Sequence, residues 1–346
     1  MSYEIGSKAL ELEFTERIAH TEYCDHTGIV RFLSGLEPLN PETAEQAYRE
    51  FFSKANYDFL WYSNDGPQWE GRITSMGHAA YVEGGKDYDN KLSCPFSSVE
   101  EVLSFDPVAE YTLPDIKERT VFFATAWKNT QQAYPDLVLP AGYYKTLFSA
   151  CIQAFGWEMF LCAAGTDHQR FDSVLEGFYK ISEANFKAWA ETGIRYFICH
   201  DDIVWSNGAV FHPDWYRKYI FPRYKKLWTI LKEKGMKVIF CSDGNFTEFI
   251  DDIANAGADG FIFEPMTDLD YIVEKYGKTK IIMGNVDCRV LTWGSRHEIE
   301  QEVTRCIIPG KKCPGFFIAV GNHIPSNVPL ENILYYFDLV EKHGKR

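Results

Sequence analysis

The sequence lacks the features that mark nucleic-acid-binding, membrane-spanning and secreted proteins. Basic residues are few beside acidic ones, 35 against 49, which gives a formal charge of −14. Such an acidic chain is a poor partner for nucleic acid or an anionic membrane. No apolar run approaches the length of about 18 residues that a membrane-spanning helix needs. The opening residues, MSYEIGSKALELEF, lack the basic and apolar regions of a signal peptide.

The cysteine pattern and the missing nucleotide motifs narrow the possibilities further. Nine cysteines are scattered without a CxxC spacing. An odd number of cysteines without an export signal is typical of reduced thiols in the cytoplasm, so we expect a cytoplasmic protein. The sequence has no P-loop, no GxGxxG and no nucleophile elbow. These absences argue against nucleotide binding and against α/β-hydrolase chemistry.

What the sequence does contain is a series of short apolar runs that each end in polar, reactive residues. Parallel strands buried on both faces are nearly all apolar, and barrel enzymes carry their catalytic groups at the carboxyl ends of such strands. The runs are Ile194–Asp202, Val238–Asn245, Gly260–Pro265, Ile281–Asp287 and Phe316–His323.

Helical stretches separate these runs, and glycine ends several of the helices. We therefore predict an α/β fold, a TIM (β/α)8 barrel, as a single domain over 1–346. It would carry an N-terminal helical extension over 1–56 and a hairpin insertion within 66–115. Expected strands lie at 58–62, 137–140, 195–199, 237–241, 260–263, 280–283 and 316–320. Expected helices lie at 116–134, 144–162, 172–192, 213–234, 247–256, 268–276, 295–307 and 329–343.

The first two runs end in acidic residues that could form a catalytic site. Asp201 and Asp202 are adjacent, and a carboxylate pair can position a substrate or share a proton. Alternatively, one of the two caps a turn and only the other is functional. Cys241 and Asp243 are two residues apart, so an extended backbone places them on the same face, where they could bind a metal or one substrate. Otherwise Cys241 is a core thiol and Asp243 caps the next helix.

The later runs add further candidates, because each also ends in a polar side chain. His323 precedes a proline-containing loop, and a neutral imidazole is the usual proton carrier near pH 7. It could instead only order that loop. His200 could equally pack against the flank of its strand or take part in catalysis. The remaining strand-end candidates are Glu264, Asn285, Asp287 and Asn322.

From about residue 170 onward, seven short motifs resemble the uroporphyrinogen decarboxylase-like superfamily. They are Asp201-Asp202, Pro213-Asp214-Trp215-Tyr216, Ser242-Asp243-Gly244-Asn245, Glu264-Pro265, Gly284-Asn285-Val286-Asp287, Gly321-Asn322-His323-Ile324-Pro325 and Pro329-Leu330-Glu331-Asn332. The N-terminal half matches only loosely. The resemblance implies a TIM barrel and either decarboxylation or cobalamin-dependent methyl transfer.

Two branches of the superfamily differ from this chain at residues that matter to them. The decarboxylases carry an RQAGRY-like segment whose arginines bind a tetrapyrrole with many carboxylates, whereas this chain has only Arg31, in GIVRFLSG. Together with the charge of −14, this makes it a poor host for an octaacid. The thiol methyltransferases carry a zinc-binding His-x-Cys and a third cysteine. The matching positions here hold Cys241 and Asp243, with Asn322 or His323 at the third.

The chain more closely resembles the methyltransferase I components of anaerobic aryl methyl ether O-demethylases. That resemblance implies methyl transfer from a methoxyarene of the guaiacol, vanillate or veratrole class to cob(I)alamin on a separate corrinoid protein. Asp202, His323 and Asp243 are then the candidates to protonate the leaving phenolate. The candidates for substrate binding are Asp201, Cys241, Glu264, Asn285, Asp287, Asn322, Trp61, Tyr62, Tyr143 and Tyr144.

The same resemblance supplies a possible zinc pattern, E-x14-E-x20-H, which Glu176, Glu191 and His212 match. Fifteen residues of continuous helix span about 22 Å, whereas ligands of one zinc lie within roughly 4 Å of each other. Both glutamates could bind one ion only if the helix at 172–192 breaks. The other metal candidates are at strand ends: Cys241, Asp243 and His323.

Several alternatives remain open at the level of sequence. The chain could be a decarboxylase of a smaller acid, a corrinoid methyltransferase with a different methyl donor, or a non-catalytic corrinoid- or tetrapyrrole-binding protein. The oligomeric state is also open, a homodimer included.

Overall fold

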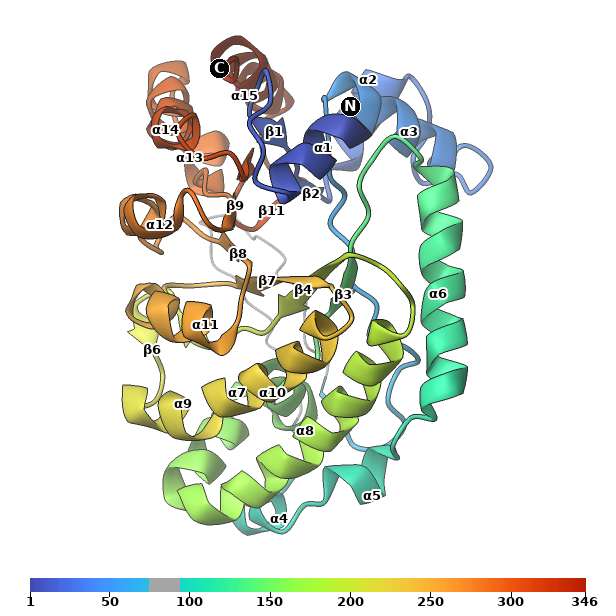
Figure 1. The fold of residues 1–346 in the computed structure, drawn as a ribbon, viewed down its shortest axis with the longest axis vertical. Coiled ribbons are helices and arrows are strands. Elements are labelled where there is room, and N and C mark those ends of the chain that lie inside the picture. Colours follow the sequence, from blue (N-terminus) through green and yellow to red (C-terminus); the bar gives the residue numbers. More distant parts are fainter. Residues whose placement is uncertain (75–93) are drawn as a thin grey trace.

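A parallel sheet surrounded by helices forms the centre of the molecule (Figure 1). The computed structural model describes residues 1–74 and 94–346. The sheet has seven strands in the order β1-β10-β9-β8-β7-β4-β3, and all neighbours are parallel. The strands are β1 (Ala19–His20), β3 (Ala141–Tyr143), β4 (Tyr196–His200), β7 (Lys237–Ser242), β8 (Gly260–Phe263), β9 (Ile281–Met283) and β10 (Phe316–Ile318).

The extended segment Asp58–Leu60 closes this sheet into a barrel. On one side the Asp58 N–H donates to the His20 carbonyl of β1 at 2.8 Å. On the other side the Leu60 N–H donates to the Val138 carbonyl at 3.0 Å, just ahead of β3, and Phe59 and Val138 form a parallel bridge. The predicted TIM (β/α)8 barrel is therefore confirmed.

The helices account for most of the remaining chain. They are α1 (Tyr3–Leu10), α2 (Thr27–Ser34), α3 (Ala44–Lys54), α4 (Val99–Leu103), α5 (Pro107–Tyr111), α6 (Ile116–Ala133), α7 (Phe148–Thr166), α8 (His168–Ala190), α9 (Pro213–Tyr219), α10 (Phe221–Lys232), α11 (Ile250–Ala256), α12 (Leu269–Tyr276), α13 (Cys288–Trp293), α14 (Arg296–Gly310) and α15 (Leu330–His343), with a 3-10 turn, η1, at Thr247–Phe249. None of the described helices combines the length and the apolar character needed to cross a membrane.

The N-terminal region is less purely helical than predicted. Besides α1, α2 and α3, residues 1–56 contain β1 and the short strand β2 (Tyr23–Cys24). β2 pairs in parallel with β11 (His323–Ile324). Each of these strands is two residues long and therefore leaves no apolar run that a sequence pattern could reveal.

The hairpin predicted within 66–115 is not found in the part of that segment that the structure describes. Residues 66–74 and 94–115 contain the short helices α4 and α5 and no strand. Residues 75–93 lie outside the described residues. The antiparallel pair that is present lies elsewhere, between β5 (Val204–Trp205) and β6 (Gly208–Ala209).

The long helix predicted at 213–234 is broken into α9 and α10. The break falls at Ile220, whose backbone angles are φ −102° and ψ −61°. Pro222 follows at the first turn of α10. A proline inside a helix removes one hydrogen bond and clashes with the carbonyl four residues earlier. A new helix beginning at Phe221 avoids both effects.

One end of the barrel is closed by α1. The Leu10 carbonyl and the Glu11 carboxylate, at the end of α1, both accept hydrogen bonds from Lys237, the first residue of β7. The side chains inside the barrel are apolar and buried; they include Phe59, Ile198, Ile239, Ile262, Met283 and Phe317. The polar side chains of the candidate site lie at the opposite end, where the strands end.

Candidate active site

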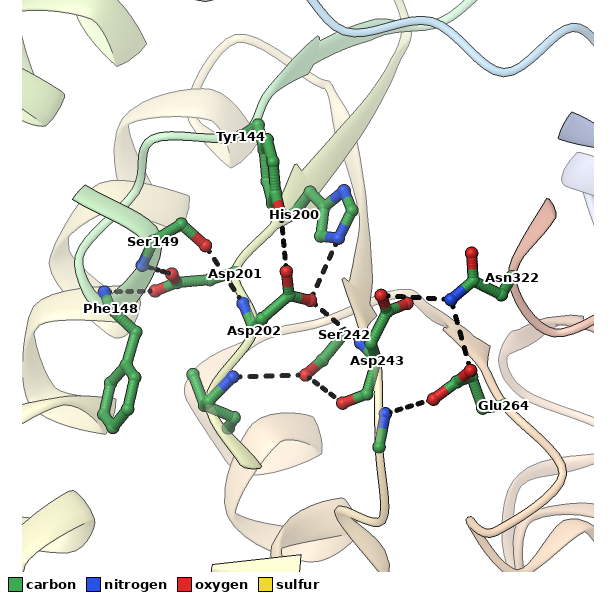
Figure 2. A network of polar contacts seen from close by, with 12 residues as sticks. Tyr144, Phe148, Ser149, His200, Asp201, Asp202, Ser242, Asp243, Glu264 and Asn322 are labelled. Carbon is green, nitrogen blue, oxygen red and sulfur yellow. Dashed lines mark hydrogen bonds and ion pairs between the residues drawn. The ribbon is translucent and has the colours of Figure 1, made fainter. Parts of the chain in front are cut away.

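A network of polar side chains occupies the carboxyl ends of the strands (Figure 2). His200 ends β4, and Asp202 follows it by two residues; Asp243 directly follows β7, and Glu264 directly follows β8. Asn322 extends the network from the last part of the barrel. Elements that are distant in sequence thus meet at a single mouth, as the strand-end pattern predicted.

Asp202 lies at the centre of this network. Its Oδ1 accepts hydrogen bonds from His200 Nε2 at 3.1 Å and from the Asp243 backbone N–H at 2.9 Å. Its Oδ2 accepts a hydrogen bond from the Tyr144 hydroxyl at 2.6 Å. Burial acts to raise the pKa of Asp202, but the His200 charge and these hydrogen bonds outweigh it, so that the pKa is lowered. The carboxylate is therefore ionised near neutral pH, a state in which it accepts hydrogen bonds; the predicted role of Asp202 as proton donor stays a prediction.

His200 faces into the site, so it does not pack against the flank of its strand. Burial acts to lower the pKa of His200, but Cys241 and Asp202 outweigh burial and raise it well above its usual value. The Tyr144 ring lies against the imidazole, with 4.0 Å between ring centroids. Tyr144 was predicted to contact an arene, and the structure places it beside His200 and Asp202.

Strand alternation explains which residues of β4 reach the site. Tyr196 and Ile198 pack inside the barrel, whereas Phe197 and Cys199 pack against the surrounding helices. Successive side chains of a strand point to opposite faces. The same parity continues through His200, the last residue of β4, to Asp202 beyond it, and both face the mouth.

Asp201 faces the other way, and its predicted substrate role is not supported. Its carboxylate accepts backbone hydrogen bonds from Leu147 and Phe148 at 3.1 Å and from Ser149 at 2.6 Å, at the N-terminus of α7. The Tyr224 hydroxyl donates to it at 2.5 Å. Burial raises the pKa of Asp201 to about 6 although these donors lower it. The residue joins β4 to α7 and is fully enclosed.

Asn322 connects the two acidic residues on the far side of the network. Its Nδ2 donates to Asp243 Oδ2 at 3.1 Å and to Glu264 Oε1 at 3.2 Å. The Gly244 N–H donates to Glu264 Oε2 at 2.5 Å. Burial, with a smaller contribution from the Asp202 charge, raises the pKa of Glu264. Asp243, Glu264 and Asn322 are thus placed in the site as predicted.

His323 is buried and reaches this network through Asn322. Its Nδ1 lies 2.7 Å from Asn322 Oδ1, and its Nε2 lies 4.0 Å from Asp25 Oδ2. The Tyr23 ring packs edge-on against it. These contacts orient the Asn322 amide, which is a positioning role.

The four predicted aromatic residues divide by strand parity. Trp61 packs against the barrel interior and stacks on Tyr23, with 6.4 Å between centroids. Tyr62 packs on the opposite side, against the outer core. The Tyr143 hydroxyl accepts a hydrogen bond from Asn185 of α8, and its ring contacts Phe186. Only Trp61 and Tyr144 can therefore contact a substrate at the mouth.

Two further predicted substrate residues have structural roles. Asn285 is fully buried; its Nδ2 donates to the Glu264 and Thr267 carbonyls, and Arg305 donates to its Oδ1. Asp287 is the N-cap of α13 and forms an ion pair with Arg289 at 2.7 Å. Both residues follow β9, and their side chains stabilise the loop there and do not join the polar network of the mouth.

Cys241 lies at the barrel-facing end of β7 and is buried beside His200. Burial raises the pKa of its thiol, although a hydrogen bond with His200 acts in the opposite direction. The thiol contributes to the wall of the site below the network. Its position two residues before Asp243 matches the same-face prediction.

The predicted zinc pattern does not form a metal site. α8 is continuous from His168 to Ala190, so Glu176 and Glu191 remain far apart along it. Glu176 forms an ion pair with Arg223 at 2.9 Å, and Glu191 with Lys234 at 3.0 Å. His212 is the N-cap of α9, and 79% of its side chain is exposed. The three side chains are separate surface features.

Replacing both glutamates of that pattern should therefore leave the site intact. The double variant Glu176→Gln, Glu191→Gln is expected to retain the metal content and the catalytic rate of the wild type within about twofold. Arg223 keeps its ion pair with Asp172, and the exposed pair of Glu191 with Lys234 contributes only about 0–1 kcal/mol. Elemental analysis and steady-state kinetics measure the two quantities. A loss of bound metal in this variant would restore the sequence pattern as the ligand set.

The fold and the strand-end network define a barrel enzyme, and comparisons with known proteins name its family. Residues 93–343 match the family described as uroporphyrinogen decarboxylase (URO-D), and the chain belongs to this family. The predicted membership of the uroporphyrinogen decarboxylase-like superfamily is thereby confirmed.

Curated relatives and a solved structure extend this finding. The uroporphyrinogen decarboxylase of Carboxydothermus hydrogenoformans is 29% identical over 130 residues, 38% of this chain and 37% of the relative. That of Syntrophotalea carbinolica is 26% identical over 200 residues, 57% of each chain. The chain thus aligns with less than two thirds of either relative. A methyltransferase from Methanosarcina mazei shares the fold at a TM-score of 0.65 and 15% identity, over 98% of both chains.

Proposed function

We propose that the protein transfers a methyl group from a methoxylated aromatic compound of the guaiacol, vanillate or veratrole class to cob(I)alamin on a separate corrinoid protein. The family and the methyltransferase neighbour support an enzyme of this general type. The donor and the acceptor are inferred from the chemistry of the mouth and from the sequence resemblance.

The observation that carries the proposal is the charge of the mouth. Asp202, Asp243 and Glu264 converge there in one hydrogen-bonded network (Figure 2). The described ion pairs place His200 against Asp202, and the charge of Arg289 lowers the pKa of Glu264 without outweighing its burial. A mouth of this kind repels a tetrapyrrole that carries many carboxylates, and it admits a neutral ether.

The proposed reaction is an in-line displacement at the methyl carbon. The electron pair of the Co(I) acceptor forms the new bond to carbon while the bond from carbon to the aryl oxygen breaks. The electron pair of the broken bond remains on that oxygen. A phenolate leaves poorly, since the pKa of its conjugate acid is about 10. Positive charge at the ether oxygen lowers this barrier.

The cluster of His200, Asp202 and Asp243 is the place where that positive charge can be held. The negative Asp202 and Asp243 stabilise a cation between them, and His200 supplies a nitrogen in the same cluster. The cation is either a proton on His200 or a metal ion bound by these side chains. Trp61 is the residue proposed to contact the arene, because it packs at the barrel cluster and aromatic rings pack favourably edge to face or offset-stacked.

Decarboxylation is the second candidate, and the curated relatives favour it, because they are named uroporphyrinogen decarboxylases. The two reactions share the barrel and differ in what the mouth must bind. A decarboxylase would need cations for its substrate carboxylates.

A comparison of the two reactions on one preparation tests the proposal. The protein is incubated anaerobically with guaiacol or veratrole and cob(I)alamin, and separately with uroporphyrinogen. We expect the Co(I) absorption to disappear only when an aryl methyl ether is present, with release of the demethylated phenol. Release of CO₂ from uroporphyrinogen, without methyl transfer from any aryl ether, would overturn the proposal.

Tyr144 is expected to act as a positioning residue through Asp202. In Tyr144→Phe the hydroxyl that donates to Asp202 Oδ2 is lost. We expect kcat to fall about 10-fold with KM nearly unchanged. This is the effect of residues that hold a catalytic group in place by a hydrogen bond without contacting the substrate. The matched control is Tyr143→Phe, which removes the neighbouring hydroxyl that bonds to Asn185, on the other side of the strand. Equal losses of kcat in both variants would contradict the assignment.

A further inference from the structure

Three side chains of the network form a group that can bind a metal ion. His200, Asp202 and Asp243 each offer one ligand atom, and these atoms all lie within 4.8 Å of one another. They come from the ends of two adjacent strands, β4 and β7, which pair along their length. Figure 2 shows the imidazole and the two carboxylates directed toward one another. Two rigid neighbouring strands fix their separation.

The hydrogen bonds around these ligands orient them as a second shell orients metal ligands. The Tyr144 hydroxyl fixes one oxygen of Asp202 at 2.6 Å. On the other side, the Asn322 amide donates to Asp243 Oδ2 at 3.1 Å. Asn322 is itself held by His323, whose Nδ1 lies 2.7 Å from Asn322 Oδ1. The ligand atoms are thus fixed from both sides of the group.

The charge of the group also favours a cation. Asp202 and Asp243 are partly buried, and Glu264 is added to them through Asn322. Carboxylate oxygens gathered at one partly buried place attract a cation more strongly than they would in bulk water. His200 is the one basic side chain that the described hydrogen bonds place against Asp202.

We propose that His200 Nε2, Asp202 and Asp243 bind one divalent metal ion of the series from Mn²⁺ to Zn²⁺. An imidazole and two carboxylates suit such borderline ions without requiring a soft thiolate. This ligand set differs from the pattern of Glu176, Glu191 and His212, and from a His-x-Cys pair at positions 241 and 243. Cys241 lies beside His200 and remains outside the set.

The inference deepens the proposed function in that the ion is the positive charge that activates the ether oxygen. Binding of the ion is a separate property and can be measured without turnover. The two claims can therefore fail separately.

Metal binding to the full-length protein tests the inference directly. The protein is stripped with a chelator and titrated calorimetrically with Zn²⁺, Mn²⁺ and Mg²⁺. We expect one site for Zn²⁺ or Mn²⁺ per chain, with Mg²⁺ binding much more weakly. His200→Gln and Asp243→Asn should each weaken metal binding by more than about 100-fold. Loss of a residue that only hydrogen-bonds to a metal ligand typically weakens binding by about 10- to 100-fold. Thermal melting verifies that each variant is folded.

The matched control is Cys241→Ser, which alters a neighbouring donor atom and should leave the affinity within about threefold, because hard and borderline ions do not depend on a thiolate. Substitution of Co²⁺ for the bound ion shows by spectroscopy whether the Cys241 thiolate is a ligand. Co²⁺ in the site should show visible ligand-field bands and no thiolate charge-transfer band.

Three results would overturn the inference. They are the absence of stoichiometric binding, binding that His200→Gln and Asp243→Asn leave unchanged, and a thiolate band that Cys241→Ser abolishes. Methyl transfer by the stripped protein would show that the function stands without the ion. Stoichiometric binding without any methyl transfer would confirm the metal site and remove the proposed function.

Discussion

Replacing Asp202 by asparagine is expected to lower kcat for methyl transfer by about 100- to 1,000-fold, the range found when one preorganised electrostatic group is removed from an active site. Asn keeps the shape of the side chain and one acceptor oxygen but removes the negative charge. That charge stabilises the cation on which the activation of the ether oxygen depends. The hydrogen bonds from His200, Tyr144 and Asp243 all converge on this carboxylate.

The matched control is Asp287→Asn, the same chemical change at another strand end. Asp287 caps α13 and pairs with Arg289. It should keep nearly full activity, because it lies outside the network. The measurement is the initial rate of Co(I) loss with veratrole for each variant, alongside its melting temperature. Full activity in folded Asp202→Asn would remove this carboxylate from the reaction.

The second large effect is expected on stability, from Asp201→Ala. This change leaves three backbone N–H groups at the start of α7 and the Tyr224 hydroxyl without their acceptor. A buried donor left without an acceptor costs about 1–3 kcal/mol, and we expect a total loss of about 4 kcal/mol in the free energy of unfolding. Asp201→Asn retains one acceptor oxygen and should lose less.

Urea unfolding of the three proteins measures this effect. The expected order of midpoints is wild type, then Asp201→Asn, then Asp201→Ala. If Asp201→Ala unfolds at the wild-type urea concentration but loses activity, Asp201 binds substrate as the adjacent carboxylate pair first indicated, and its assignment to α7 is wrong.

The second half of the fold could be predicted because its units carry strong local signals. Apolar strands such as Gly260–Phe263 lie within one residue of their expected bounds, and glycine follows helices such as α11. β1 and the segment Asp58–Leu60 carry weaker signals, although they close the barrel. The segment Asp58–Leu60 pairs with β1 and with Val138, and both partners are distant in sequence, which no local pattern encodes.

The site was predicted as a set of strand ends, but the direction of each side chain was not. Alternation along β4 separates Asp202, which faces the mouth, from Asp201, which faces α7. The same alternation would have favoured His200, had it been extended one residue beyond the expected strand at 195–199. Tyr144 could not be assigned in this way, because its contact with Asp202 depends on the pairing of β3 with β4.

The course of the loops decides the roles of two polar residues that the sequence had left open. Asn285 and His323 both follow barrel strands, yet Asn285 bonds to backbone carbonyls and His323 orients Asn322. A polar residue at a strand end can support the loop or face the mouth, and only the course of the following backbone separates the two.

The most direct test of the central claim follows the methyl group itself. Guaiacol carrying a trideuterated methyl group is incubated anaerobically with the protein and cob(I)alamin, and both products are analysed by mass spectrometry. The proposed function predicts trideuteromethyl-cobalamin and catechol in equal amounts, with all three deuterium atoms retained. Catechol without labelled cobalamin, or no catechol with any methoxyarene while uroporphyrinogen is decarboxylated, would contradict it.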